Sequence, residues 1–163
     1  MVRYASCPSP FGRICIGWEE NAVVSLRLGA PDSHSPSPVT ELAAAQLQEY
    51  FAQTRKSFTF PTKLTGTPFQ ISVWEELTRI PYGETRTYGE IAKAIGNPKA
   101  VRAVGMACNR NPIWIVIPCH RVVGSNHKLT GYAGGLTMKD ALLNLERKKA
   151  AAYAAASIFP KTI

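Results

Sequence analysis

Residues 87–109 read Thr-Tyr-Gly-Glu-Ile-Ala-Lys-Ala-Ile-Gly-Asn-Pro-Lys-Ala-Val-Arg-Ala-Val-Gly-Met-Ala-Cys-Asn, and this stretch predicts two short helices joined by a tight turn. Thr87, with Glu90 three positions later, forms a capping box that starts the first helix. Gly96 supplies the left-handed residue that ends it, and Asn97-Pro98 is typical of the start of the next helix. The pattern predicts a helix-turn-helix, which favours DNA binding; an ordinary helical hairpin in an enzyme has the same pattern.

The second helix of this pair combines small side chains with positive charge. Lys99 and Arg102 are three positions apart, so on a helix they share a face, and small residues such as Ala103 allow close approach to a groove. The chain carries a net charge of +8, and residues 66–149 hold twelve Lys or Arg against six acids, a net +6. A basic half indicates an acidic partner, most simply nucleic acid, although a solubilising surface is the alternative.

An apolar run downstream of the helix pair leads directly into a cysteine. Ile113–Ile117 predicts a buried strand, and Pro118 ends it because proline cannot donate to a ladder. Cys119 follows, with His120 as its next neighbour. A thiol is a strong nucleophile only as thiolate, and a nearby imidazole can accept its proton. The pair therefore indicates nucleophilic chemistry; the alternative is a buried structural cysteine beside a surface histidine.

The first 65 residues predict a small α+β unit. Strand-like runs at Val2–Ser6, Arg13–Trp18 and Ala22–Leu28 alternate with turn residues and predict an antiparallel sheet. Thr40 is the expected N-cap of a helix whose apolar positions are Leu47, Tyr50 and Phe51.

The rest of the chain predicts a mostly helical second domain. Thr67-Pro68 is an N-cap followed by proline at the first helical position, with Phe69, Val73 and Leu77 on the buried face. We expect an N-terminal domain at residues 1–65 and a C-terminal domain at 66–163. Within the latter, Ala150–Ala156 is Ala-rich and predicts a frayed extension.

Composition is that of a globular chain, with 45% hydrophobic and 18% charged residues. Because no apolar run is long enough to span a bilayer and no signal-peptide pattern is present, we expect a cytoplasmic protein. The four cysteines form no CxxC pair and should be reduced thiols. We expect no required metal; a zinc site built from Cys7, Cys15 and His34 stays an alternative, although a fourth ligand is not evident.

Four blocks of sequence, Gly96–Gly105, Asn111-Pro112, Ile117–Gly124 and Gly131–Leu136, resemble in order and spacing the O6-alkylguanine-DNA alkyltransferases, or methylated-DNA–protein-cysteine methyltransferases. The resemblance runs from about residue 67 to 146, and the first part resembles the family's ribonuclease-H-like domain in layout. It implies a monomer that repairs double-stranded DNA by stoichiometric, irreversible transfer of the methyl or larger alkyl group from O6-methylguanine to Cys119, without a cofactor. Activity on O4-methylthymine stays open.

The resemblance also implies roles around Cys119. His120 would act as its base through a water, and Glu146 would accept a hydrogen bond from the histidine, although alone it is more typical of a solvated helix residue. Asn111 would brace the turn before the cysteine. Tyr88 would donate toward the guanine ring and crowd the target phosphate. This is the nucleophile, base and orienting group of hydrolytic triads.

DNA contact and base extrusion are implied for a further set of residues. Arg102 would enter the base stack from a helix in the minor groove while the target nucleotide flips out. Lys139 matches a family position near the site, but a surface lysine is an equal alternative. The other DNA-contacting residues would be Asn97, Lys99, Ala103 and Tyr88, and those of the base pocket would be Cys108, Trp114, Val122, Tyr132, Ala133 and Gly134.

Several positions depart from the family pattern. His127 stands where glycine is usual in a turn, so we expect a strained or altered turn there, and Ala141 replaces an aromatic residue. Cys108 and Trp114 also differ from common pocket residues. Two other classes of function are weighed: a lesion-binding relative, which would lack Cys119, and a cysteine hydrolase, which would turn over and would not need the helix-turn-helix.

Overall fold

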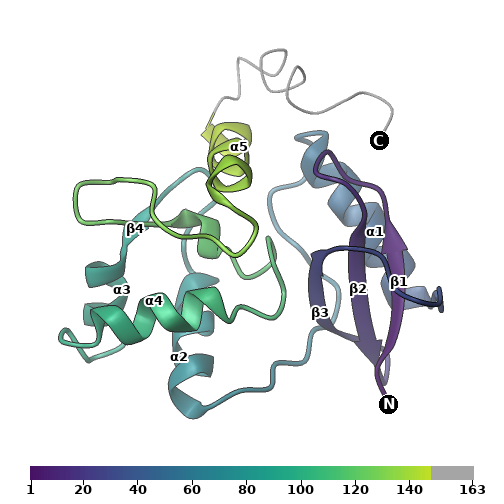
Figure 1. Ribbon diagram of the computed structural model, residues 1–163, viewed down its shortest axis with the longest axis horizontal. Coiled ribbons are helices and arrows are strands. Elements are labelled where there is room, and N and C mark those ends of the chain that lie inside the picture. The colour runs from purple at the N-terminus through teal and green to yellow at the C-terminus, as the bar shows by residue number, and fades with distance from the viewer. Residues whose placement is uncertain (148–163) are drawn as a thin grey trace. The chain divides into compact units, whose positions relative to one another are not determined.

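A computed structural model describes residues 1–147 (Figure 1), so the stretch Ala150–Ala156 lies outside the described residues. Contacts within the chain define two compact units. The first is Met1–Leu64 together with the described residues from Asn144 onward, and the second is Thr65–Leu143.

The first unit is built on an antiparallel sheet in the order β1-β2-β3 (Figure 1). Its strands are β1 (Arg3–Cys7), β2 (Ile14–Glu19) and β3 (Ala22–Leu28), which confirms the three predicted strands. The β2–β3 turn forms at Glu20 and Asn21, which both have positive φ, and such turns match the twist of paired strands.

Helix α1 (Pro38–Phe51) packs against this sheet and closes the core of the unit. Leu47 and Tyr50 are fully buried, as expected. The predicted cap was wrong: Ser37 is the N-cap, and Thr40 occupies the third helical position of a capping box. The physical reason is Pro38, which is pre-organised for the first helical position and places the cap one residue before it.

The zinc hypothesis finds no support in the first unit. The His34 imidazole accepts a hydrogen bond from the backbone N–H of Ser6 (3.2 Å). Across residues 1–147, no three His, Cys, Asp or Glu side chains gather as metal ligands. All four cysteines are free thiols, as predicted.

The second unit is mostly helical. Helix α2 (Pro68–Leu77) starts at the predicted Thr67 cap and buries Val73 and Leu77. The Trp74 indole donates to the backbone carbonyl of Ala107 (2.9 Å), which ties α2 to α4. The remaining elements are β4 (Arg86–Thr87), α3 (Tyr88–Ala94), α4 (Val101–Asn109), β5 (Val122–Val123) and α5 (Leu136–Arg147).

The helix pair α3–α4 is present, but its link is longer than predicted. The Thr87–Glu90 capping box and the left-handed Gly96 (φ 82°) are confirmed. Asn97 does not cap α4: its N–H bonds to the Ala92 carbonyl (2.9 Å) and closes α3. A turn follows, in which the N–H of Ala100 bonds to the Asn97 carbonyl (3.0 Å).

Helix α4 therefore starts at Val101, and Lys99 lies before it in the turn rather than on the helix. The structural reason is that the Asn97 backbone is already used to end α3. Lys99 and Arg102 consequently do not share a helical face.

The strand predicted at Ile113–Ile117 was wrong. The Ile117 N–H bonds to the Ile113 carbonyl (3.0 Å), so the segment folds back as a tight turn. Ile115 takes a left-handed conformation (φ 73°), which is rare for a β-branched residue. The alternating burial of Ile113, Ile115 and Ile117 is nevertheless strand-like, and a short apolar run does not separate these cases.

The fold class is confirmed: a small antiparallel sheet with a helix, then a mostly helical part containing a helix-turn-helix. Among the helices of residues 1–147, none combines the length and the apolar character needed to cross a membrane.

Candidate active site

A short parallel strand pair places the cysteine segment beside the start of α3. Strand β5 pairs with β4, with Arg86 opposite Val122 and Thr87 opposite Val123. Cys119 lies just before β5, in a 3₁₀ turn spanning Cys119–Arg121. The nucleophile candidate and the helix-turn-helix are therefore joined by backbone hydrogen bonds.

Arg121 anchors the 3₁₀ turn from its other side. Its guanidinium donates to the Ile80 carbonyl (2.7 Å) and lies 5.8 Å from the centroid of the Tyr82 ring. Arg121 is buried, although nothing in the sequence other than its position two residues after Cys119 indicated this. The turn that carries the thiol is thus held at a fixed place.

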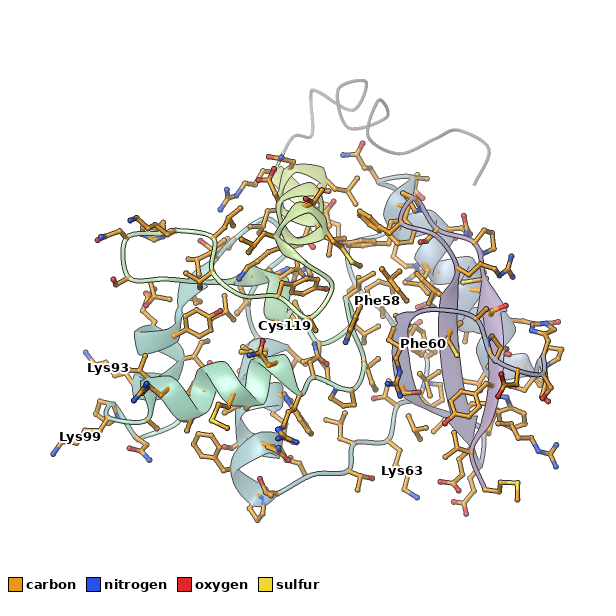
Figure 2. The ribbon with its side chains drawn as sticks, viewed as in Figure 1. Phe58, Phe60, Lys63, Lys93, Lys99 and Cys119 are labelled. Atoms are coloured by element: carbon orange, nitrogen blue, oxygen red, sulfur yellow. The ribbon has the colours of Figure 1, made fainter. Side chains whose placement is uncertain are left out.

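Asn111 holds the thiol directly. Its side-chain N–H₂ donates to the Ile117 carbonyl (2.7 Å) and to the Sγ of Cys119 (3.1 Å), while its Oδ1 accepts from the Ile113 N–H (2.9 Å). Both Asn111 and Cys119 are buried, and Figure 2 shows the Cys119 side chain inside the helical unit. The Asn111 amide has its own polar groups hydrogen-bonded and also points an N–H donor at the sulfur. Such a donor stabilises negative charge on the sulfur and so favours the thiolate form of Cys119.

Burial sets the resting state of the thiol. It raises the pKa of Cys119 to about 11, and the Asn111 hydrogen bond and the positive charge of Lys139 oppose that rise. Burial also raises the pKa of Cys108, and a charge on Cys119 raises it further. The resting site therefore holds neutral thiols near pH 7, and ionisation of Cys119 requires a base.

Lys139 is a buried cation at this site, so the surface-lysine alternative is wrong. Its ammonium donates to the carbonyls of Thr130 (2.7 Å) and Gly131 (3.3 Å) and lies 5.8 Å from the centroid of the Tyr88 ring. Burial lowers the pKa of Lys139, and negative charge on Cys119 opposes this. A cation in this place ties down the loop before α5 and stabilises a thiolate.

Tyr88 links the start of α3 to the same loop. Its hydroxyl accepts a hydrogen bond from the Thr130 hydroxyl (3.3 Å). Its ring faces α4 at Gly105, where an added Cβ would lie 3.9 Å from ring atom Cε1. Burial raises the pKa of Tyr88, so its hydroxyl stays protonated and able to donate.

His120 and Glu146 are both buried, which rules out a surface histidine and a solvated glutamate. His120 belongs to the unit of Cys119, whereas Glu146 belongs to the unit that contains α1. There, the hydroxyl of Tyr50 donates to a Glu146 carboxylate oxygen (2.6 Å). A hydrogen bond between His120 and Glu146 stays a prediction.

Four of the five residues expected to contact DNA lie on the outer surface of the helix pair, and the fifth, Tyr88, is half-buried. Asn97, Lys99, Arg102 and Ala103 are all exposed. Figure 2 shows Lys93 and Lys99 projecting from the end of the unit where α3 and α4 are joined. Residues 86–110 carry five Lys or Arg and one acid. This surface is suited to phosphate contact.

The expected pocket residues lie on α4, where Cys108 is buried, on the turn before Cys119, in β5 and in the loop before α5. Val122 is buried in β5, and the rings of Trp114 and Tyr132 lie 6.0 Å apart. Ala133 is exposed, and Gly134 is half-buried. A side chain does not fit at position 134, because a Cβ built on Gly134 would lie 2.9 Å from the Tyr132 ring. These residues bring the loop before α5 near the turn of Trp114.

The turn at His127, expected to be strained or altered, is strained and keeps its geometry. His127 takes a left-handed conformation (φ 57°), and its N–H bonds to the Gly124 carbonyl (2.8 Å). The turn keeps the left-handed geometry that glycine adopts freely. That conformation is less favourable for histidine, because its Cβ approaches the following carbonyl oxygen.

Sequence reasoning missed Thr130 and the β4–β5 pairing. Thr130 contributes its carbonyl to Lys139 and its hydroxyl to Tyr88. A two-residue strand gives no periodic signal, and a backbone carbonyl is independent of residue type. The available signal was a lysine on the apolar face of α5, three residues before Leu142.

Reactivity of Cys119 toward iodoacetamide should rise about tenfold per pH unit from pH 7 to 10, because only the thiolate attacks and the thiol is still protonated there. The rise should level off near the raised pKa of about 11. Lys139→Met removes the cation that lowers this pKa, so its reaction should be slower at every pH below 10. Peptide mass spectrometry of the Cys119 peptide measures both rates; a profile already flat at pH 8 would contradict a protonated resting thiol.

Comparisons with known proteins agree over both parts of the chain. Residues 2–64 match the family described as 6-O-methylguanine DNA methyltransferase, ribonuclease-like domain, and residues 68–148 match its DNA binding domain. A constitutive methylated-DNA–protein-cysteine methyltransferase of Bacillus subtilis is 48% identical over 90% of this chain and 96% of its own length. A methylated-DNA–protein-cysteine methyltransferase of Methanosarcina acetivorans is 52% identical over 88% of this chain and 97% of its own length.

A solved structure supports the same comparison. The Mycobacterium tuberculosis protein OGT, crystallised in complex with DNA, is 46% identical and superposes with a TM-score of 0.83. The superposition covers 89% of this chain and 92% of that one.

Proposed function

The chain belongs to the 6-O-methylguanine DNA methyltransferase family, and from this we propose that it repairs DNA by direct transfer of an alkyl group from the O6 of guanine to its own Cys119. The observation that carries the residue assignment is the hydrogen bond from Asn111 to the Cys119 sulfur. It aims a donor at a buried thiol on a fixed turn beside a basic helix-turn-helix.

The reaction is a single displacement at carbon. The Cys119 thiolate donates an electron pair to the methyl carbon, the C–O6 bond breaks, and its electrons leave with the guanine. The products are S-methylcysteine and a guanine that takes up one proton. Because a thioether has no acidic proton to lose and no route back to a thiol, each molecule acts once.

Activation of the thiol is the first requirement. Since the pKa of Cys119 is about 11, His120 accepts the proton through a water as substrate binds, and Asn111 and Lys139 stabilise the sulfur anion. Glu146 accepts a hydrogen bond from one ring nitrogen of the histidine, which leaves the other ring nitrogen able to accept the proton. This is the role of the orienting acid in a triad, with a thiol in place of a hydroxyl.

The leaving guanine is the second requirement, because it develops negative charge as the bond breaks. Tyr88 supplies a hydroxyl proton donor there, and its raised pKa keeps that proton in place at neutral pH. Backbone groups of Cys119, Val122 and Ala133 contact the base edge. Lys139 closes the loop of Tyr132 and Gly134 over it.

Extrusion of the nucleotide is the third requirement, since the O6 of a stacked guanine is out of reach of a buried thiol. Helix α4 enters the minor groove, and Arg102 fills the space that the nucleotide leaves. The cations of the α3–α4 surface bind phosphates. We expect the protein to act as a monomer in the cytoplasm.

The experiment that tests the function is intact and peptide mass spectrometry after mixing the protein with a duplex carrying one O6-methylguanine. One methyl group on the Cys119 peptide, in amounts equal to the lesion repaired, supports the proposal. Repair without protein modification would indicate a turning-over hydrolase, and tight binding without modification a lesion-binding protein. A second duplex with O4-methylthymine tests that substrate in the same way.

A further inference from the structure

An exposed methionine stands on the helix expected to meet DNA. Met106 is 61% exposed on α4, and no other large apolar side chain of residues 1–147 except Met1 is more exposed. The side chains nearest to it along the helix surface are those three and four positions away, among them Ala103 and the exposed cations Arg102 and Arg110. A single exposed apolar side chain is common on protein surfaces, so the reason to assign Met106 a partner is its place between two cations on the helix expected to meet DNA, and not its exposure alone.

The direction of Met106 follows from the geometry of α4. Gly105 faces Tyr88, with a Cβ built at Gly105 lying 3.9 Å from the ring. At about 100° per residue, Arg102 points about 60° and Met106 about 100° from Gly105, in the same rotational sense. Arg102 therefore stands between the Tyr88 side of the helix and Met106.

The positive charge around Met106 indicates what kind of partner this surface of α4 binds. Residues 86–110 carry five cations and one acid, so the surface around Met106 suits a polyanion. An apolar side chain within a basic surface is the combination used by minor-groove proteins, which insert Met, Leu, Ile or Phe between base steps and partly unstack them. A protein partner with an apolar pocket would have no need of the cations.

We propose that Met106 is a second wedge, which packs in the minor groove against the complementary strand while Arg102 fills the gap in the lesion strand. This inference rests on the proposed function. The flipped nucleotide leaves toward Tyr88 and Cys119, so the side of Arg102 away from Tyr88 faces the strand that stays stacked. Apolar contact with its sugars stabilises the opened groove.

The test compares alkyl transfer from a duplex with transfer from the single lesion strand. Met106→Ala should lower the duplex-to-single-strand rate ratio about fivefold, the effect of losing the burial of about one methylene-sized group. Met106→Leu should restore the ratio, because it keeps the apolar bulk. Leu42→Ala removes an exposed apolar side chain from α1 and should change neither rate.

A separate experiment tests which DNA strand Met106 contacts. In a duplex with a one-nucleotide gap opposite the lesion, the Met106→Ala penalty should disappear. An unchanged ratio in Met106→Ala, equal losses on both substrates, or a penalty that persists across the gap would each overturn the wedge. Absence of transfer in the unmodified protein would instead overturn the proposed function.

Discussion

Cys119→Ala should abolish alkyl transfer and leave binding to the lesion duplex intact. Deletion of a catalytic nucleophile costs about 10⁴-fold or more, and here no bond to the alkyl group can form without sulfur. Binding should persist because Cys119 is buried and the cationic surface of α3–α4 is untouched. Loss of Sγ leaves Asn111 still bonded to the Ile117 carbonyl at 2.7 Å, so the turn keeps its shape.

Two variants make this result specific. Cys119→Ser keeps a group that accepts the Asn111 hydrogen bond but is a much weaker nucleophile at carbon, so it should fold and bind without transferring. Cys7→Ala is the matched control, because Cys7 is also buried and burial raises its pKa to about 11. Methyl transfer to a peptide other than that of Cys119 would show that the nucleophile is assigned wrongly.

Local signals in the sequence predicted the elements whose ends have side-chain caps. Thr67 caps α2 and Thr87 forms a capping box, both as predicted, and Gly96 ends α3 as expected. The failures occur where one residue has two possible roles. Asn97 is a good N-cap and also a good residue to follow a C-terminal glycine. In the structure its backbone N–H bonds to α3, so Asn97 ends α3 and does not cap α4.

The candidate site was predictable as a set of residues but not as a geometry. Cys119 and Asn111 are separated by a segment with strand-like composition, which folds back at Ile115. That turn brings the Asn111 amide to 3.1 Å from sulfur, a contact that a strand of the predicted length would prevent. Tertiary packing decides such short apolar segments, because their periodicity fits several buried conformations.

The burial of Lys139 could not be predicted from the sequence either. Its sequence position fits a surface lysine as well as a buried one, since charged residues on helices are mostly solvated. It is buried because two adjacent carbonyls, those of Thr130 and Gly131, satisfy the ammonium. Loop carbonyls have no sequence signature, so the acceptors of a buried cation cannot be read from side chains.

Arg102→Ala should slow transfer from duplex DNA about a hundredfold relative to transfer from the free base O6-methylguanine, because extrusion of a nucleotide costs a few kcal/mol that the planar cation offsets. Arg102 is exposed on α4, so its truncation removes no core packing. The free base needs no extrusion and should report only on the chemistry at Cys119. The ratio of the two single-turnover rates is therefore the measurement.

Arg102→Lys separates charge from shape. Lysine keeps the positive charge but cannot stack as a plane, so we expect it to recover phosphate attraction and little of the lost ratio. Arg79→Ala serves as the control, since Arg79 is an exposed arginine after α2 paired with Glu76 at 2.8 Å. Full recovery in Arg102→Lys would reduce the role of Arg102 to electrostatic attraction, and equal losses on duplex and free base would place it in the chemistry of the thiol instead of in the opening of the duplex.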